Sequence, residues 1–428
     1  MSRFRGIQSR VVMTGRSPFT DGFPTVCRIP SRMHAVHQYQ QNITVRWDFP
    51  VVFTQHLFRE ENPVLRETIL RLGENRRHRV LFYVDSRILE GNPDLGAAVT
   101  SYCERHADVL DLAAPPQSVP GGEACKNDFR YVEHLLRELL TLRMDRQSFV
   151  VVIGGGAALD AVGFAAALVH RGLRLIRVPT TVLGQNDAGV GVKNAVNYLG
   201  KNAIGTFAPP FAVLNDFEFL RTLPDRDWLC GVAEAFKVAI IRDAVFFEDL
   251  CQAAPQYPAR NFEAMTDLVR RCAILHLDHI RSNGDPFEYG TARPLDFGHW
   301  SAHKIELLSN FAVSHGEAVA AGVLLDSLYA ESQGWISSNE LERIDSGLRR
   351  SGFRLWFDAY NLRNARGERL VFEGLRDFQE HLGGELCVTF PRGIGARFEV
   401  NTIDLACMEK AICALEERAL RGAGMPVV

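Results

Sequence analysis

Short apolar runs and stretches of helical periodicity alternate along the first half of the chain. Runs rich in β-branched and aromatic residues predict strands, and apolar residues three and four positions apart predict helices. The expected strands are 43–49, 79–85, 108–113, 149–153, 173–179 and 211–216, and the expected helices are 62–72, 97–106, 129–144 and 157–170. This alternation predicts a parallel sheet with crossover helices.

The second half of the chain shows a different pattern of apolar and polar residues. Helical patterns dominate from about residue 220 to about residue 350, and one late strand pair is expected near 385–390 and 396–400. We therefore expect an α/β domain over 42–220 and a mostly helical domain over 221–428. Residues 1–41 carry six arginines against the single acid Asp21 and show no periodicity. We expect a disordered or poorly ordered extension, or a start codon placed too early, rather than a transit peptide.

Composition narrows the class of protein. Of the 428 residues, 46% are apolar and 23% charged, which is typical of a globular protein, and the length favours two domains. A net charge of −3 gives no electrostatic case for nucleic acid or an anionic membrane. The nine cysteines include no CxxC pair, which indicates reduced thiols. We expect a cytoplasmic protein without a nucleic-acid or membrane partner.

Three glycines mark a candidate nucleotide site. Gly154, Gly155 and Gly156 join a buried strand to a helix N-terminus, where backbone N–H groups and the helix dipole can hold a diphosphate. A tight turn that only needs small residues is the alternative. Three further side chains could contact a ribose or phosphate of the cofactor. They are Asp85 at the end of an early strand and the pair Glu123 and Lys126 in a glycine-containing turn.

The segment 179–202 is the candidate phosphate loop. It holds Lys193, Lys201 and Asn202 among several glycines, so that ammonium groups, an amide and backbone N–H groups can surround an anion. A solvated basic loop is the alternative.

Histidines in the second half indicate a metal site. His299 and His303 lie four residues apart on one predicted helix, His315 opens another, and Glu234 precedes Lys237 on a third. Imidazole and carboxylate ligands suit a zinc-like ion. Spacing alone pairs His299 with His303 as ligands.

The motifs together resemble a known family. GGGxxxD, RGxxxxxVPTT, QxDxGVGxKxxVN, GKNxIGxFxPP, AExxK, GHxxxHxxE and HGEAVAxG occur here in the order found in 3-dehydroquinate synthases and other sugar phosphate cyclases. RPLDFGHWxAHKxE and EHLGGEL look like the EboD-type, dehydroquinate synthase-like branch. The resemblance implies a homodimer of NAD-binding and metal-binding domains, with zinc or alternatively cobalt. It also implies a phosphate-eliminating lyase acting on a small sugar phosphate.

The resemblance also implies roles for single residues. It assigns the metal to Glu234, His299 and His315, and it makes His303 a proton-handling residue rather than a ligand. Substrate and phosphate contacts are expected from Asp187, Lys193, Lys201, Asn202 and Lys237, of which Asp187 and Lys193 are also expected near the cofactor. Cofactor contacts are expected from Asp160, Thr180, Thr181 and Thr222. Arg171 matches an arginine that reaches the partner's active site.

Departures from the family pattern concern the end of the site that binds a carboxylate in dehydroquinate synthases. Asp296 replaces an asparagine, His276 stands near a missing lysine, and Arg293 is one residue out of place. A late DKK motif is replaced by Gln379, Glu380 and His381, the last a candidate hydrogen-bond donor. We therefore expect a neutral-ended substrate of the sedoheptulose 7-phosphate type. A true 3-dehydroquinate synthase, a metal-dependent polyol dehydrogenase and a non-catalytic NAD-binding scaffold are the alternatives.

Overall fold

A parallel sheet forms the first half of the folded chain. The computed structural model describes residues 39–282, 287, 294–381 and 384–422, and the elements below belong to the unit Trp47–Val428. The sheet order is β1-β9-β6-β5-β2-β3, with β4 also paired to β2, and every pairing is parallel. The strands are β1 Val51–Thr54, β2 His78–Asp85, β3 Leu110–Leu112, β4 Gln117–Val119, β5 Phe149–Gly154, β6 Arg174–Pro179 and β9 Ala212–Asp216.

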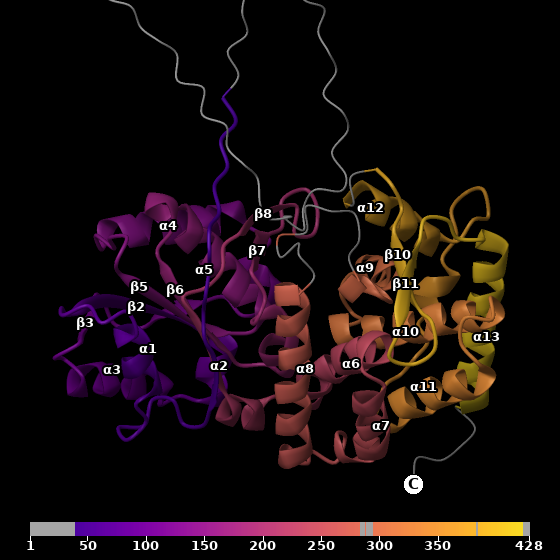
Figure 1. The fold of residues 1–428 in the computed structure, drawn as a ribbon, viewed down its shortest axis with the longest axis horizontal. Coiled ribbons are helices and arrows are strands. Elements are labelled where there is room, and N and C mark those ends of the chain that lie inside the picture. The colour runs from indigo at the N-terminus through magenta and orange to yellow at the C-terminus, as the bar shows by residue number, and fades with distance from the viewer. Residues whose placement is uncertain (1–38, 283–286, 288–293, 382–383, 423–428) are drawn as a thin grey trace, which may run out of the picture. The chain divides into compact units, whose positions relative to one another are not determined.

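Helices cover both faces of this sheet (Figure 1). Successive residues of a strand point to opposite faces. Val80 and Phe82 of β2 accordingly pack with α1 and α3, whereas Leu81 and Tyr83 pack with α4 and α5. The helices are α1 Val64–Leu70, α2 Ser86–Gly91, α3 Leu95–Arg105, α4 Phe129–Thr141 and α5 Gly156–Leu168. The predicted α/β class is confirmed.

The strand predicted at 43–49 is wrong. These residues carry no strand, and 43–48 are exposed. The first strand of the described residues is β1, which pairs with β9 from Val51 opposite Val213. Among the described residues no strand pairs with 43–49, so the alternating pattern alone misplaced the element.

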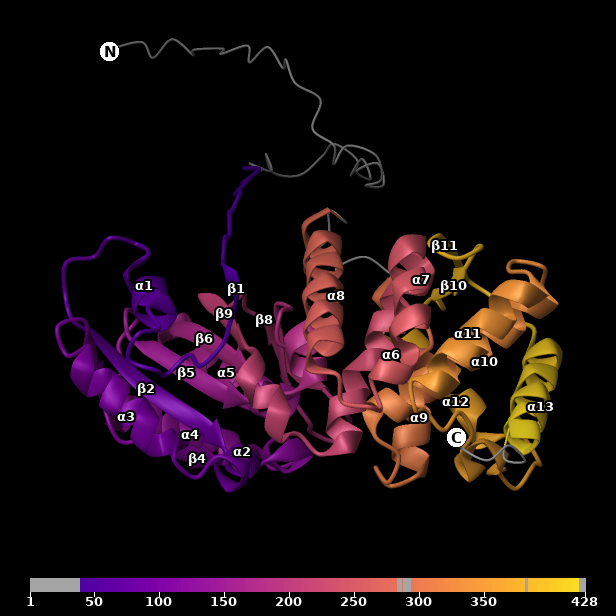
Figure 2. The same ribbon diagram turned by 90° about the horizontal axis from the view of Figure 1, so that it is seen from below.

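A helical region follows the sheet. It comprises α6 Asp225–Arg242, α7 Ala244–Ala253, α8 Phe262–Ser282, α9 His299–Leu308, α10 His315–Ser332, α11 Ser338–Arg350, α12 Glu373–His381 and α13 Leu405–Gly422, with the hairpin β10 Val388–Pro391 and β11 Arg397–Val400. Both views place α8 between the sheet and the remaining helices (Figures 1 and 2). α10 is buried continuously from Ala318 to Ala330, as expected of a helix at the centre of a bundle.

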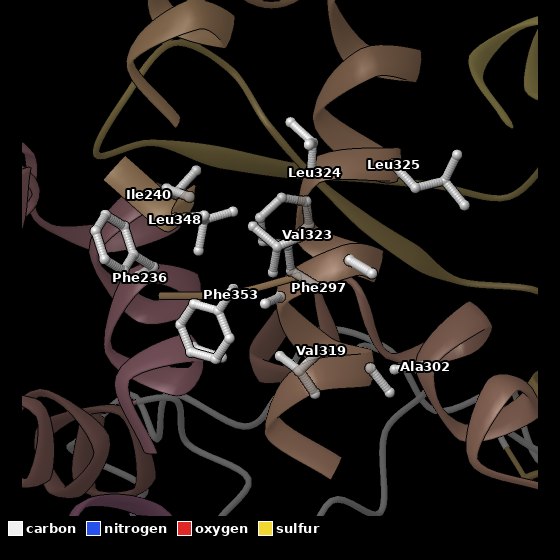
Figure 3. Close-up of a cluster of buried hydrophobic side chains, with 14 of the residues drawn as sticks. Phe236, Ile240, Phe297, Ala302, Val319, Val323, Leu324, Leu325, Leu348 and Phe353 are labelled. Atoms are coloured by element: carbon white, nitrogen blue, oxygen red, sulfur yellow. The ribbon is translucent and has the colours of Figure 1, made fainter. Parts of the chain in front are cut away.

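The core of the helical region surrounds α10. Figure 3 shows Val319, Val323 and Leu324 of α10 among Phe236 of α6 and Phe297, which precedes α9. This packing fixes α6, α9 and α10 against one another. Within the described ranges, no helix has the length and apolar character needed to span a bilayer.

Candidate active site

The strand order places a topological switch point, here called the crevice, at the carboxyl ends of β2 and β5. These neighbouring strands pair directly, yet the chain continues from β2 to β3 on one side and from β5 to β6 on the other. Cofactors in open α/β sheets bind at such a switch point. Asp85 and Gly154 are the last residues of the two strands, so the predicted cofactor residues lie at the expected place.

The glycine turn is closely packed. A Cβ on Gly154 would lie 2.8 Å from Ala158 Cβ and 3.0 Å from Asp85 Cβ, and one on Gly155 would lie 3.3 Å from Thr181 Cγ2. α5 begins at Gly156, with no side-chain cap on its first N–H groups. Asp85 is 5% exposed and accepts a hydrogen bond from Arg87 N at 2.9 Å. Burial raises the pKa of Asp85.

The other two side chains predicted to contact the cofactor here, Lys126 and Glu123, form hydrogen bonds with residues of the protein. Lys126 Nζ donates to Asp160 Oδ2 at 2.8 Å and to Asn202 Oδ1 at 2.5 Å. Glu123 Oε2 accepts from Asn197 Nδ2 at 3.1 Å. These contacts tie the crevice to the hairpin of β7 Lys193–Val196 and β8 Ile204–Phe207, between which Asn202 lies.

The predicted threonines lie beside the crevice. Thr180 and Thr181 directly follow β6, and Thr180 N donates to Gly154 O at 3.0 Å. Thr180 Oγ1 is buried without a hydrogen bond among the described residues, whereas Thr181 Oγ1 accepts from Gly184 N at 2.9 Å. Thr222 Oγ1 accepts from Asn92 Nδ2 at 3.2 Å, next to α2.

Sequence reasoning missed Arg177, which organises the candidate phosphate loop 179–202. This β6 arginine is fully buried and donates to Gly189 O at 3.1 Å, Gly191 O at 2.8 Å, Lys193 O at 2.7 Å and Asn194 Oδ1 at 2.8 Å. Burial lowers its pKa to about 10. The signal in the sequence was an arginine between the apolar residues Ile176 and Val178 of this strand.

Asp187 connects the loop to the helical region. It lies in the π-helical turn Gly184–Ala188, a form that is frequent at functional sites. Its carboxylate lies 3.5 Å from Lys237 Nζ of α6 and 3.3 Å from His276 Nδ1 of α8. The neighbouring Asn186 Nδ2 donates to Gly231 O of α6 at 2.7 Å. His276, noted only as a departure from the family pattern, thus belongs to the site.

The predicted metal ligands converge. Oε1 of Glu234 lies 3.5 Å from His299 Nε2 and 3.2 Å from His315 Nε2. The three ligand atoms all lie within 4.8 Å of one another. Glu234 is fully buried, and its Oε2 contacts Lys237 Nζ. Burial alone would raise the pKa of Glu234, but Lys237 and His299 hold it well below its usual range.

Hydrogen bonds behind the ligands orient both imidazoles. His299 Nδ1 lies 3.1 Å from Phe297 O, and His315 Nδ1 lies 3.1 Å from Glu306 Oε2. Lys201 Nζ in turn donates to Glu306 Oε1 at 2.7 Å. Metal-binding histidines commonly have such partners, which leave Nε2 for the ion. Glu306 stood in a family motif without an assigned role.

A second group of possible ligands, His303, Glu306 and His315, also lies within 4.8 Å. Both oxygens of Glu306 are already bonded, however, and His315 directs Nε2 toward Glu234. Burial, with His299 and Lys201 nearby, holds the pKa of His303 well below its usual range, so this imidazole is neutral. The donors of Glu234, His299 and His315 therefore fit a zinc-like ion better.

Four predicted site residues remain, namely Asp296, Arg171, Arg293 and His381. Asp296 is half-buried and precedes α9. Burial alone would lower the pKa of Lys237, but the charges of Glu234, Asp187 and Asp296 raise it. Arg171 is exposed at the opposite end of β6 from the crevice. Arg293 and the side chain of His381 lie outside the described residues.

Comparison with known proteins identifies the family. The chain matches the 3-dehydroquinate synthase N-terminal domain over residues 117–230 and the C-terminal domain over residues 231–369. It is 34% identical over 301 residues to a 3-dehydroquinate synthase of Shewanella sp. (strain MR-4), covering 69% of this chain and 80% of the relative. The chain belongs to the 3-dehydroquinate synthase family.

Solved structures of related proteins share the fold. ValA, a 2-epi-5-epi-valiolone synthase from Streptomyces hygroscopicus subsp. jinggangensis 5008 with NAD+ and Zn2+ bound, has a TM-score of 0.77 at 26% identity, covering 89% of this chain and 100% of ValA. A 2-deoxy-scyllo-inosose synthase complexed with carbaglucose-6-phosphate, NAD+ and Co2+ has a TM-score of 0.69 at 22% identity, covering 85% and 96%. The superfamily resemblance is confirmed.

Proposed function

We propose that this member of the 3-dehydroquinate synthase family is a sugar phosphate cyclase that uses NAD and a divalent metal to convert a seven-carbon sugar phosphate into a carbocycle with loss of phosphate. The observation that carries the proposal is the contact of Lys201 with Glu306 at 2.7 Å. Lys201 and the proposed metal ligand His315 contact the two oxygens of the same carboxylate, which supports a phosphate site next to the metal site. A polyol dehydrogenase has no phosphate for that lysine to neutralise.

The proposed cofactors fit the residues present. The crevice between β2 and β5 offers a helix N-terminus and the unbonded hydroxyl of Thr180 to NAD. Glu234, His299 and His315 offer one oxygen and two nitrogens to zinc or cobalt. Bound there, NAD would supply hydride transfer and the metal ion would supply a Lewis acid for substrate oxygens.

The protein's own groups supply the remaining chemistry. Lys193, Lys201 and Asn202 bind the phosphate and stabilise its charge as it leaves. Neutral His303 accepts a proton from a substrate hydroxyl or from the carbon next to the transient ketone. Asp187 and His276 hold Lys237 and the substrate hydroxyls in place. We expect Lys193→Ala to abolish phosphate release while the fold remains.

We further propose a neutral-ended substrate of the sedoheptulose 7-phosphate type. Asp296 lies within electrostatic range of Lys237. A carboxylate on the substrate would be repelled there, whereas sugar hydroxyls can donate to Asp296. The likeness to a 2-epi-5-epi-valiolone synthase supports this proposal, and the relative named 3-dehydroquinate synthase supports the alternative substrate, the carboxylate-bearing precursor of dehydroquinate.

Phosphate release from the two sugar phosphates tests the proposal. We expect a higher kcat/KM for sedoheptulose 7-phosphate, and we expect Asp296→Asn, which removes the charge at nearly constant volume, to shift the ratio toward the carboxylate-bearing substrate. A wild-type preference for the carboxylate-bearing sugar would identify an ordinary 3-dehydroquinate synthase. NADH accumulating with glycerol and no phosphate release would identify a dehydrogenase.

A further inference from the structure

Asp326 is a buried carboxylate on α10 that forms no ion pair within the described ranges. Its Oδ2 accepts a hydrogen bond from Gly298 N at 3.0 Å, and its Oδ1 accepts one from Trp300 Nε1 at 2.8 Å. Burial raises its pKa to about 7. Burying a carboxylate without a nearby cation costs free energy, so the position of Asp326 requires an explanation.

The two donors to Asp326 are the residues on either side of His299. Gly298 is the N-cap of α9, lies in the left-handed region with φ of 77°, and provides no side-chain cap. The carboxylate of Asp326, on the neighbouring helix, accepts from the backbone N–H of this N-cap residue, as the third-position carboxylate of a capping box does, and its negative charge also suits the positive end of the α9 dipole. Asp326 thus holds the start of α9 at two points, the backbone N–H of Gly298 and the side chain of Trp300.

Close backbone contact makes this arrangement rigid. A Cβ on Gly322 would lie 2.1 Å from Gly298 O, and a Cβ on Gly298 would lie 2.8 Å from Val323 N. Phe297 and Val323 pack in the same apolar cluster at this crossing (Figure 3). The first turn of α9 is therefore pressed against α10, one helical turn before Asp326.

A purely stabilising role explains these contacts poorly. Apolar side chains of similar volume often replace buried charges without loss of stability. The carboxylate can instead fix geometry, because its two oxygens accept from the backbone N–H before His299 and from the Trp300 side chain after it. His299 Nδ1 then lies 3.1 Å from Phe297 O, and Nε2 faces Glu234.

We propose that Asp326 is a positioning residue of the metal centre, which holds Gly298 and Trp300 so that His299 Nε2 meets Glu234 and His315. The inference rests on the metal ligands of the proposed function. α10 then contributes to the centre twice: it carries the ligand His315 at its first turn, and through Asp326 it orients the ligand His299 on α9.

Metal binding to the full chain tests this role. Asp326→Asn leaves one acceptor and turns an amide N–H₂ toward one of the two donors. We expect it to weaken zinc binding at least about tenfold, the usual effect of removing a partner behind a ligand, and to change the visible absorption of the cobalt-loaded protein. The control is Asp345→Asn on α11. Asp345 is also buried and accepts from Arg349 Nε at 2.6 Å and Arg418 Nη1 at 2.9 Å, so we expect lower stability but unchanged metal affinity and spectrum.

Trp300→Phe provides a second, milder variant, since it keeps the ring packing and removes one donor. We expect a smaller change of affinity and spectrum in the same direction. Wild-type affinity and spectrum in Asp326→Asn would overturn the proposal, and if that variant does not fold, the same result in Trp300→Phe would overturn it. A wild-type protein that binds neither zinc nor cobalt would instead contradict the metal assignment in the proposed function.

Discussion

Glu306 illustrates how the site depends on single side chains whose partners are distant in the sequence. One oxygen accepts from Lys201, 105 residues earlier, and the other faces His315 Nδ1. Burial alone would raise the pKa of Glu306, but His315 and Lys201 lower it strongly. The sequence could predict the ligand types of the metal site, but it could not predict this bridge or the role of Arg177, because both arise from tertiary contacts.

The choice between the two ligand groups can be tested by substitution. We expect Glu234→Gln, His299→Ala and His315→Ala each to lose stoichiometric zinc, because each removes one of three donors. His303→Ala should keep zinc and lose turnover. Metal content by mass spectrometry and phosphate release measure the two effects. Loss of zinc from His303→Ala, with zinc retained in Glu234→Gln, would instead favour the group of His303, Glu306 and His315.

Buried His279 should make stability depend on pH. Burial, together with Arg242 of α6 and Arg397 of β11, lowers its pKa to about 3, and His276 and Lys237 add to this shift. Below pH 6.5 the unfolded chain binds a proton that the folded protein does not bind. The free energy of unfolding therefore falls as pH decreases from about 6.5 toward 3, by up to about 1.4 kcal/mol per pH unit.

Replacing His279 with glutamine should flatten that dependence. Urea unfolding at pH 5 and pH 7.5 should show a smaller difference for His279→Gln than for the wild type. His134→Gln, a substitution of an exposed residue on α4, serves as the control and should retain the wild-type difference. Equal slopes for His279→Gln and wild type would show that His279 is protonated in the folded protein.

At the scale of elements, hydrophobic pattern located most of the sheet and its crossover helices. Six apolar runs, continuous or alternating, predict strands in the first half of the chain. Five of these predicted strands lie within a few residues of observed strands between β2 and β9. The hairpin of β7 and β8 was missed, because its polar residues and glycines lack alternation. Its position depends on Arg177 and on the contact of Asn194 with α5, neither of which a local pattern reveals.

Two glycines on helices should respond oppositely to alanine. Alanine usually stabilises a helix by up to about 1 kcal/mol relative to glycine. On α5, however, a Cβ at Gly163 would lie 2.0 Å from Asn194 Oδ1, whereas nothing lies within 4 Å of one at Gly96 on α3. We expect Gly163→Ala to destabilise by about 1–3 kcal/mol through overpacking, and Gly96→Ala to be neutral or stabilising. Denaturant unfolding measures both. Equal gains would mean that Asn194 moves aside freely.

At the scale of the whole molecule, the family resemblance predicts that Arg171 completes the site of a partner subunit. Arg171 precedes β6, whereas Thr180 and the crevice follow it, and six residues of strand span roughly 20 Å. His170 and Arg171 both have positive φ, at 51° and 67°, and both are exposed. Arg171 and the crevice therefore lie at opposite ends of β6, and the role of Arg171 in a partner's site stays a prediction.

Mixing two inactive variants tests this expectation. Arg171→Ala keeps its own catalytic residues but cannot complete the partner's site, and His303→Ala has the opposite defect. If both are inactive alone, unfolding and reassembling an equal mixture should give half mixed dimers, each with one complete site. We expect about one quarter of wild-type phosphate release. Two separately refolded samples, combined afterwards, control for activity that does not require subunit exchange. If Arg171 serves its own subunit, every mixed dimer holds one defect in each site, and the mixture stays inactive although size measurements show that mixed dimers have formed.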